Sequence, residues 1–195
     1  MKIPKVVNFF IKGLSREIQN VPDGFYDTFQ YTTTGNNLTH PRTIGYITKV
    51  VWGIQNAAVV ESDLRINEGG VKFQPDIFVR DSKNRPLLVV DYESPNSSDA
   101  RIPSKNIKPY LKWGESVPYI IVTSLPKKSS TGWELRYTSR GSYNRPHMRK
   151  MKEIRSNPFK YWFKIYRHKI KKWNSKLRNV YFVNINAKKV SLETL

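Results

Sequence analysis

The chain has 195 residues, of which 38% are hydrophobic and 13% aromatic, enough for one packed domain and unlike a disordered or low-complexity chain. It contains no cysteine and three histidines, which excludes disulfides, thiolate zinc sites and cysteine nucleophiles. The formal net charge of +19 exceeds what solubility alone requires and predicts a nucleic-acid partner. The apolar stretches are too short for a membrane span or a signal peptide, so we expect a cytoplasmic protein with no membrane partner.

The first half of the chain predicts two helices and then three strands. A short helix is expected over 5–19, and a second over 41–56, where apolar residues recur at helical spacing behind Pro41. Strands are expected over 57–66, 71–80 and 86–93, because these runs are rich in apolar residues and are separated by turn-type segments. We therefore expect a three-stranded meander.

The second half predicts a helix, further strands and a basic extension. A helix is expected over 103–114 despite Pro109, and the apolar run 117–125 predicts a buried strand beside the meander. Residues 132–140 alternate like an edge strand, and 179–185 form a last strand candidate after a partly helical basic segment. These elements predict a single α/β domain over 1–195, with a mixed β-sheet flanked by helices.

Acidic side chains interrupt the apolar strand pattern in "LLVVDYE", where Asp91 and Glu93 follow four apolar residues. A carboxylate at the end of a buried strand needs a cation, a donor or a bound proton to compensate its lost solvation. Asp91 and Glu93 are two apart, so they share one face of the strand. A hairpin between 71–80 and 86–93 can also bring Asp76 to Asp91 if the register allows.

Three converging carboxylates would repel one another, and Mg²⁺, or Mn²⁺ in its place, relieves that repulsion while retaining waters for chemistry. Such a site suits phosphodiester hydrolysis, with Lys105 or Lys108 orienting the attacking water. Glu61 lies on an alternating strand, where it is either part of a solvated face or an accessory metal ligand. His40 is either a helix-start residue or a catalytic one.

Pro75-Asp76 followed by Asp91-Tyr92-Glu93 resembles the motif of the PD-(D/E)XK nuclease superfamily. The continuation is similar to a segment of Uma-type putative restriction endonucleases, in which an acidic residue precedes a Ser-Pro turn, a Lys-bearing helix, a Tyr, a Gly and a "VP(E)YW" strand. The places in that pattern are filled here by Asp91, Ser94-Pro95, Lys105, Tyr110, Gly114 and Val117-Pro118-Tyr119. "THPRTIGYITKVVW" also resembles the leading helix of that family, with His40 at the place of its His, so the resemblance spans about residues 38–124.

The resemblance implies a restriction-endonuclease-like fold with Asp76 and Asp91 as metal ligands. It also implies that Lys105, on the helix, replaces the strand lysine of the superfamily, with Lys108 as the rival position. Glu93 stands where the common motif has Lys. A Glu there can bind metal or deprotonate water, and the alternative is a site that has lost catalysis.

The C-terminal extension over 145–195 carries much of the positive charge, with thirteen Lys and Arg against one acid between 145 and 178. Interleaved aromatic residues can pack or stack on bases. The sequence thus predicts a Mg²⁺-dependent DNA endonuclease, the alternatives being a non-catalytic nucleic-acid-binding protein on a nuclease fold and a basic RNA-binding protein; RNA as the substrate and a homodimer stay open. The predicted nucleic-acid contacts are Lys160, Lys164, Arg167, Lys169, Lys171 and Lys172.

Overall fold

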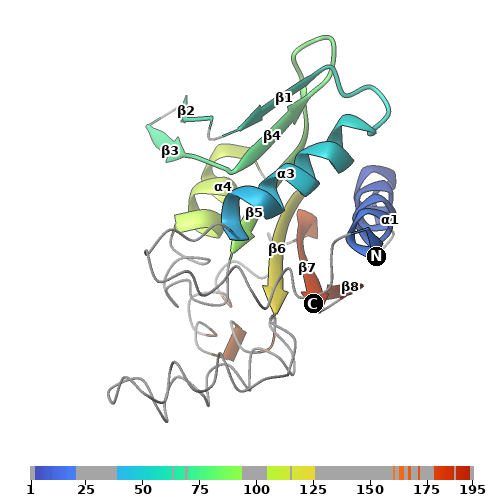
Figure 1. Ribbon diagram of the computed structural model, residues 1–195. Coiled ribbons are helices and arrows are strands. Elements are labelled where there is room, and N and C mark those ends of the chain that lie inside the picture. The colour runs from blue at the N-terminus through green and yellow to red at the C-terminus, as the bar shows by residue number, and fades with distance from the viewer. Residues whose placement is uncertain are drawn as a thin grey trace, which may run out of the picture.

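The computed structural model describes residues 3–20, 39–62, 64–68, 70–93, 105–114, 116–125, 178–186 and 188–193, together with positions 160, 163, 164, 167 and 171 (Figure 1). Among the helices of these residues, none is both long and apolar enough to cross a membrane. The fold is α/β, with a mixed sheet of six strands between helices. This confirms the predicted fold class at that level.

The six-stranded sheet has the order β1-β4-β5-β6-β7-β8. Its centre, β5, β6 and β7, is parallel, and the outer pairs β1/β4, β4/β5 and β7/β8 are antiparallel. The central strands read as continuous apolar runs because helices or other segments cover both faces of a parallel sheet. The strands are β1 (Val59–Ser62), β4 (Ile77–Arg80), β5 (Pro86–Glu93), β6 (Tyr119–Leu125), β7 (Val180–Asn186) and β8 (Lys189–Glu193).

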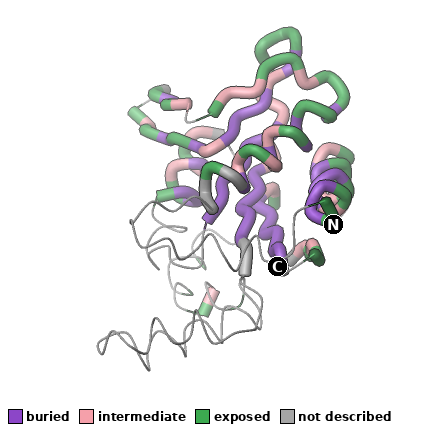
Figure 2. The backbone as a smooth tube through the Cα atoms, in the orientation of Figure 1, coloured by how far each residue is buried: buried purple, intermediate pink, exposed green. Residues whose placement is uncertain are grey.

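Two long helices cover one face of the sheet and a short helix covers the other (Figure 1). These helices are α1 (Lys5–Gln19) and α3 (Thr39–Trp52) on the first face and α4 (Lys108–Gly114) on the second. The buried positions of α1 recur every three or four residues, so a single apolar stripe faces the core. Figure 2 shows the buried residues concentrated in the central strands and on the inner sides of these helices.

The side chains of β5 and β6 alternate between two apolar clusters, one on each face of the sheet. Val90 and Tyr92 pack with α1 and α3, whereas Val89 lies in the cluster that contains Tyr110 of α4. Asp91 and Glu93 fall on the α4 side by the same alternation. The face with α1 and α3 is therefore a conventional core, and the acidic residues belong to the other face.

The three predicted helices are confirmed, although α3 ends at Trp52 and α4 begins at Lys108, and so are the predicted strands 86–93, 117–125 and 179–185. The three-stranded meander is wrong in detail. The predicted strands 57–66 and 71–80 are each interrupted, and their adjoining ends form a separate antiparallel pair, β2 (Ile66–Glu68) and β3 (Val71–Phe73). Pro75 lies at the second interruption, where it has no N–H to donate to a strand ladder. Strand β8 was not predicted, and the predicted strand 132–140 lies outside the described residues.

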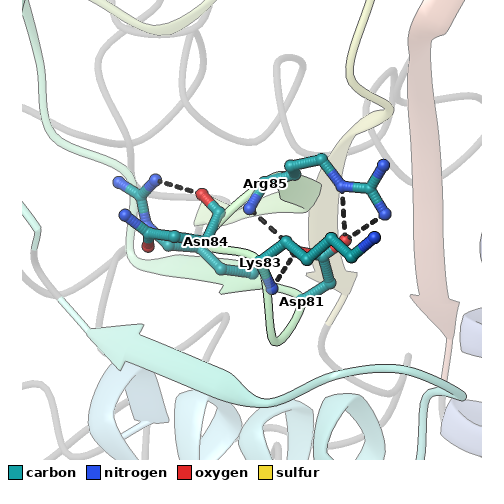
Figure 3. A network of polar contacts seen from close by, with 5 residues as sticks. Asp81, Lys83, Asn84 and Arg85 are labelled. Atoms are coloured by element: carbon teal, nitrogen blue, oxygen red, sulfur yellow. Dashed lines mark hydrogen bonds and ion pairs between the residues drawn. The ribbon is translucent and has the colours of Figure 1, made fainter.

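The turn between β4 and β5 is organised by Asp81 (Figure 3). Its Oδ1 accepts hydrogen bonds from the backbone N–H groups of Lys83 (2.9 Å) and Arg85 (2.8 Å), and its Oδ2 accepts one from Arg85 Nε (2.7 Å). The hydrogen bond from the Arg85 backbone is the largest of the effects that hold the pKa of Asp81 below its ordinary value. Asn84 takes the left-handed conformation (φ 60°) that a tight turn requires. The turn thus fixes the hairpin whose open end carries the acidic residues.

Packing between α1 and α3 can be tested at Gly13, where a Cβ would come within 2.8 Å of Val50 Cγ1. Gly13→Ala should lower the free energy of unfolding by about 1 kcal/mol, because overpacking costs about 1–3 kcal/mol and the better helix propensity of Ala returns about 1. Gly45→Ala in α3 is the matched control, since that position faces open space. It should raise the free energy by up to about 1 kcal/mol. Urea denaturation measures both; equal stabilisation by the two substitutions would contradict this packing.

Candidate active site

Asp76 and Asp91 each accept a hydrogen bond from a backbone N–H of the other's segment. The backbone N–H of Asp76 donates to Asp91 Oδ1 (2.8 Å), and the backbone N–H of Tyr92 donates to Asp76 Oδ2 (2.7 Å). Ile77 pairs with Val90 in the ladder, so the next pair in register would be Asp76 and Asp91. Side-chain oxygens therefore replace the ladder at this point, and the predicted meeting of the two carboxylates is present in the structure.

Asp91 is only 4% exposed, and its environment makes its charge costly. Burial, followed by the negative charge of Asp76, raises the pKa of Asp91 to about 7, with a smaller contribution from the charge of Glu93. Hydrogen bonds from the Tyr119 hydroxyl to Asp91 Oδ2 and from the Asp76 N–H act in the opposite direction. At neutral pH, Asp91 thus lies close to its titration midpoint, where a bound cation would favour its ionised form.

Tyr119 is a site residue that the sequence reasoning did not identify as one. It lies fully buried at the start of β6, in register with Val89, and its hydroxyl reaches Asp91. Burial and then the charge of Asp91 raise its pKa well above the ordinary value, so the hydroxyl keeps its proton and remains a donor. The available signal was a tyrosine within an apolar strand, because a buried phenol needs a hydrogen-bond partner.

Glu93 lies two positions beyond Asp91 and is 5% exposed. Its Oε1 accepts a hydrogen bond from Asn106 Nδ2 (2.8 Å). Asn106 is itself buried, and nothing in the sequence pattern had marked it as a site residue. The helix following β5 therefore contributes an uncharged amide to the acidic face.

The turn that carries Asn106 separates it from the two lysines predicted for the site. Residues 105–107 form a π-helical turn immediately before α4, and such turns recur at functional sites. Asn106 and Ile107 point inward and are buried, whereas the side chains of Lys105 and Lys108 are exposed. Asn106, rather than either lysine, is the residue of this turn that hydrogen-bonds Glu93.

Polar residues continue from Glu93 across the parallel strands. Glu93 is in register with Thr123 of β6, and Thr123 with Asn184 of β7. Both are buried, and in the part of the chain that the structure describes Asn184 Oδ1 has no hydrogen-bond partner. The carboxyl ends of parallel strands are where α/β folds bind ligands. Glu93, two positions beyond Asp91, thus lies at one end of a polar row over three strands.

The remaining predicted residues lie apart from the acidic pair or outside the described residues. Glu61 Oε2 pairs with Arg80 Nε at 3.1 Å. His40 lies in the first turn of α3, but its side chain is outside the described part of the structure, as are Lys169 and Lys172. The other four predicted nucleic-acid contacts lie at helical positions with exposed side chains; they are Lys160, Lys164, Arg167 and Lys171.

The oxygen-rich donor set suits a hard cation such as Mg²⁺. The raised pKa of Asp91 marks a charge that the protein alone compensates only in part. Each carboxylate oxygen can accept two interactions, so the hydrogen bonds to Asp91 leave capacity for a metal. Across the described residues, however, no group of three or more His, Cys, Asp or Glu side chains is arranged to hold a metal ion. Asp76 and Asp91 are the pair that would hold one, with Glu93 on the same face.

Comparison with protein-family models, curated proteins and solved structures finds no match to the chain.

Asp91 should make the stability of the protein depend on pH. Its pKa is raised to about 7 in the folded chain from roughly 3.9 when unfolded, so the folded state binds more protons between these values. The contribution of Asp91 to the free energy of unfolding therefore falls as the pH rises from about 4 to about 7. Asp91→Asn, which retains shape and an acceptor, should gain stability relative to the parent across this window. Urea denaturation at several pH values tests this; a constant difference between the two proteins would contradict it.

Proposed function

We propose that the chain is a metal-dependent endonuclease that hydrolyses phosphodiester bonds in DNA, on a restriction-endonuclease-like fold. The observation that carries the proposal is the close approach of Asp76 and Asp91, whose carboxylates accept backbone hydrogen bonds from Tyr92 and Asp76, with Asp91 buried and its pKa raised to about 7. Perturbed carboxylates at the ends of strands are typical of catalytic sites. The net charge of +19 favours nucleic acid as the substrate.

The arrangement of elements supports the same proposal. Helix α3 precedes the β4–β5 hairpin, and α4 and β6 follow it, which is the element order implied by the resemblance to Uma-type putative restriction endonucleases. The two aspartates of the motif meet at the open end of the hairpin. Glu93, in the place of the motif lysine, is held by Asn106.

In the proposed reaction, a water oxygen attacks the phosphorus, the bond from phosphorus to the leaving sugar oxygen breaks, and that oxygen takes up a proton. A bound Mg²⁺ would stabilise the charge that develops on the phosphate and lower the pKa of the attacking water. Asp76 and Asp91 would hold the cation, and Tyr119 orients Asp91 through its hydroxyl. Glu93 serves as a further oxygen ligand or as the acceptor of the proton from water, with its carboxylate positioned by Asn106.

A second function, nucleic-acid binding without catalysis, is favoured by the hydrogen bonding of the site. Both oxygens of Asp91 already accept protein donors, and the charge at the place of the motif lysine is negative. A former active site can retain its fold through such contacts. The two functions differ in metal-dependent cleavage, while both include binding to DNA.

Cleavage assays distinguish these functions. The full chain is incubated with supercoiled plasmid, single-stranded DNA and RNA in Mg²⁺, Mn²⁺ or EDTA. We expect cleavage of plasmid with either metal and none in EDTA. Asp91→Asn should reduce the rate by more than the 10- to 100-fold that is typical of changes around a metal ligand, because it removes a ligand charge.

Glu17→Gln is the matched control for these assays, since Glu17 is a mostly buried carboxylate in α1 on the other face of the sheet, paired with Lys49. It should cleave at the rate of the parent. Binding without cleavage under every metal condition would favour the non-catalytic function. Cleavage by Asp91→Asn at the rate of the parent would overturn the proposed site.

A further inference from the structure

Three exposed lysines lie on and just before α4. They are Lys105, Lys108 and Lys112, here called the α4 lysine row. Lys108 and Lys112 are four residues apart in α4, which places them on one side of the helix, and Lys105 precedes them in the π-helical turn. Within the described part of the chain, none of the three pairs with a carboxylate. The row is therefore a concentration of positive charge without a described counterion.

The opposite side of α4 is anchored in the core, which fixes the row in place. Ile107 and Tyr110 are fully buried, and the Tyr110 hydroxyl donates to the carbonyl oxygen of Val117. The Tyr110 and Tyr119 rings pack with centroids 4.7 Å apart, and Trp113 lies against Phe78 at 5.4 Å. A ligand of the row would thus meet cations on a rigid support, so less ordering would oppose its binding.

The α4 lysine row lies beside the acidic site. Asn106, the neighbour of Lys105 in the chain, hydrogen-bonds Glu93, and α4 covers the face of the sheet to which Asp91 belongs. Phe163, from the C-terminal extension, packs against the same apolar cluster as α4. Positive charge from two separate segments is consequently attached to the side of the sheet that carries the carboxylates.

We propose that the α4 lysine row binds phosphates along one strand of duplex DNA and so guides that strand to Asp76 and Asp91. This rests on the proposed function in taking DNA as the partner. Lys108 and Lys112 are one turn apart, about 6 Å along the helix axis, which is close to two steps of about 3.4 Å along one strand of the duplex. An exposed lysine ammonium group attracts a phosphate as a compact positive charge. The proposal assigns Lys105 and Lys108 to substrate binding instead of to the chemical step.

The test compares two triple variants of the full chain. In one, Lys105, Lys108 and Lys112 are all replaced by Gln; in the control, Lys5, Lys12 and Arg16 are replaced by Gln. The control residues are exposed on α1, which covers the other face of the sheet. Both variants remove three positive charges and leave the buried side chains unchanged, and equal melting temperatures would verify that both remain folded.

Binding to a fluorescent duplex is measured by anisotropy over a KCl titration in EDTA, where no metal supports cleavage. The slope of log affinity against log salt should fall in magnitude by about 2 to 3 in the α4 variant, at about 0.9 for each phosphate that is no longer neutralised, and should hardly change in the control. Equal slopes for parent and α4 variant, or an equal decrease in the control, would overturn the proposal. A change confined to a single-stranded probe would also overturn it. Because cleavage plays no part, the outcome is independent of whether the protein is a nuclease.

Discussion

Two hydrogen bonds, from the Asp76 N–H to Asp91 and from the Tyr92 N–H to Asp76, connect the fold of this protein to its candidate chemistry. The Asp91 carboxylate accepts a hydrogen bond from the residue just before β4, and the Asp76 carboxylate accepts one from Tyr92 of β5. Acidic side chains therefore replace the regular ladder at the open end of the β4–β5 hairpin. At the other end, Asp81 closes the turn. The position of the two charges is thereby determined by the hairpin register, and not by the flexibility of a loop.

The two faces of the sheet have different roles in this account. The face under α1 and α3 is apolar and supplies much of the hydrophobic core. The face under α4 combines an aromatic cluster with Asp91, Glu93 and Asn106. Burial from water strengthens the repulsion between the carboxylates, so a bound cation would relieve a larger repulsion than at an exposed site. The Tyr119 hydroxyl and the Asp76 N–H offset only part of this cost, which is why the pKa of Asp91 stays raised.

Much of the fold could be predicted because helical spacing and apolar runs are local signals. The interruption at Pro75 was harder to predict: the surrounding residues read as one strand, and the separation of β2 and β3 from the main sheet depends on tertiary packing. Strand β8 was missed because Val190 and Leu192 are only half-buried within a short polar segment.

The acidic pair could be predicted from its own residues, because a carboxylate that interrupts a buried apolar strand needs a partner to offset its lost solvation. The residues that hydrogen-bond the acidic side chains were harder to predict. Asn106 enters the site through the π-helical turn before α4, whose direction depends on how the aromatic residues pack. The lysines on either side of it are sequence neighbours that point to solvent. The sequence therefore predicted a lysine of this turn at the site, whereas the residue of the turn that hydrogen-bonds Glu93 is Asn106.

The central claim is that Asp76 and Asp91 form a mutually repelling acidic pair whose repulsion a divalent cation relieves. A pH titration of the Asp91 carboxyl carbon by NMR, first in EDTA and then with Mg²⁺, tests it most directly, with Asp91→Asn to assign the signal. We expect a midpoint near 7 in EDTA and a clearly lower midpoint with Mg²⁺. A midpoint near the ordinary value of about 4 that Mg²⁺ leaves unchanged would contradict it.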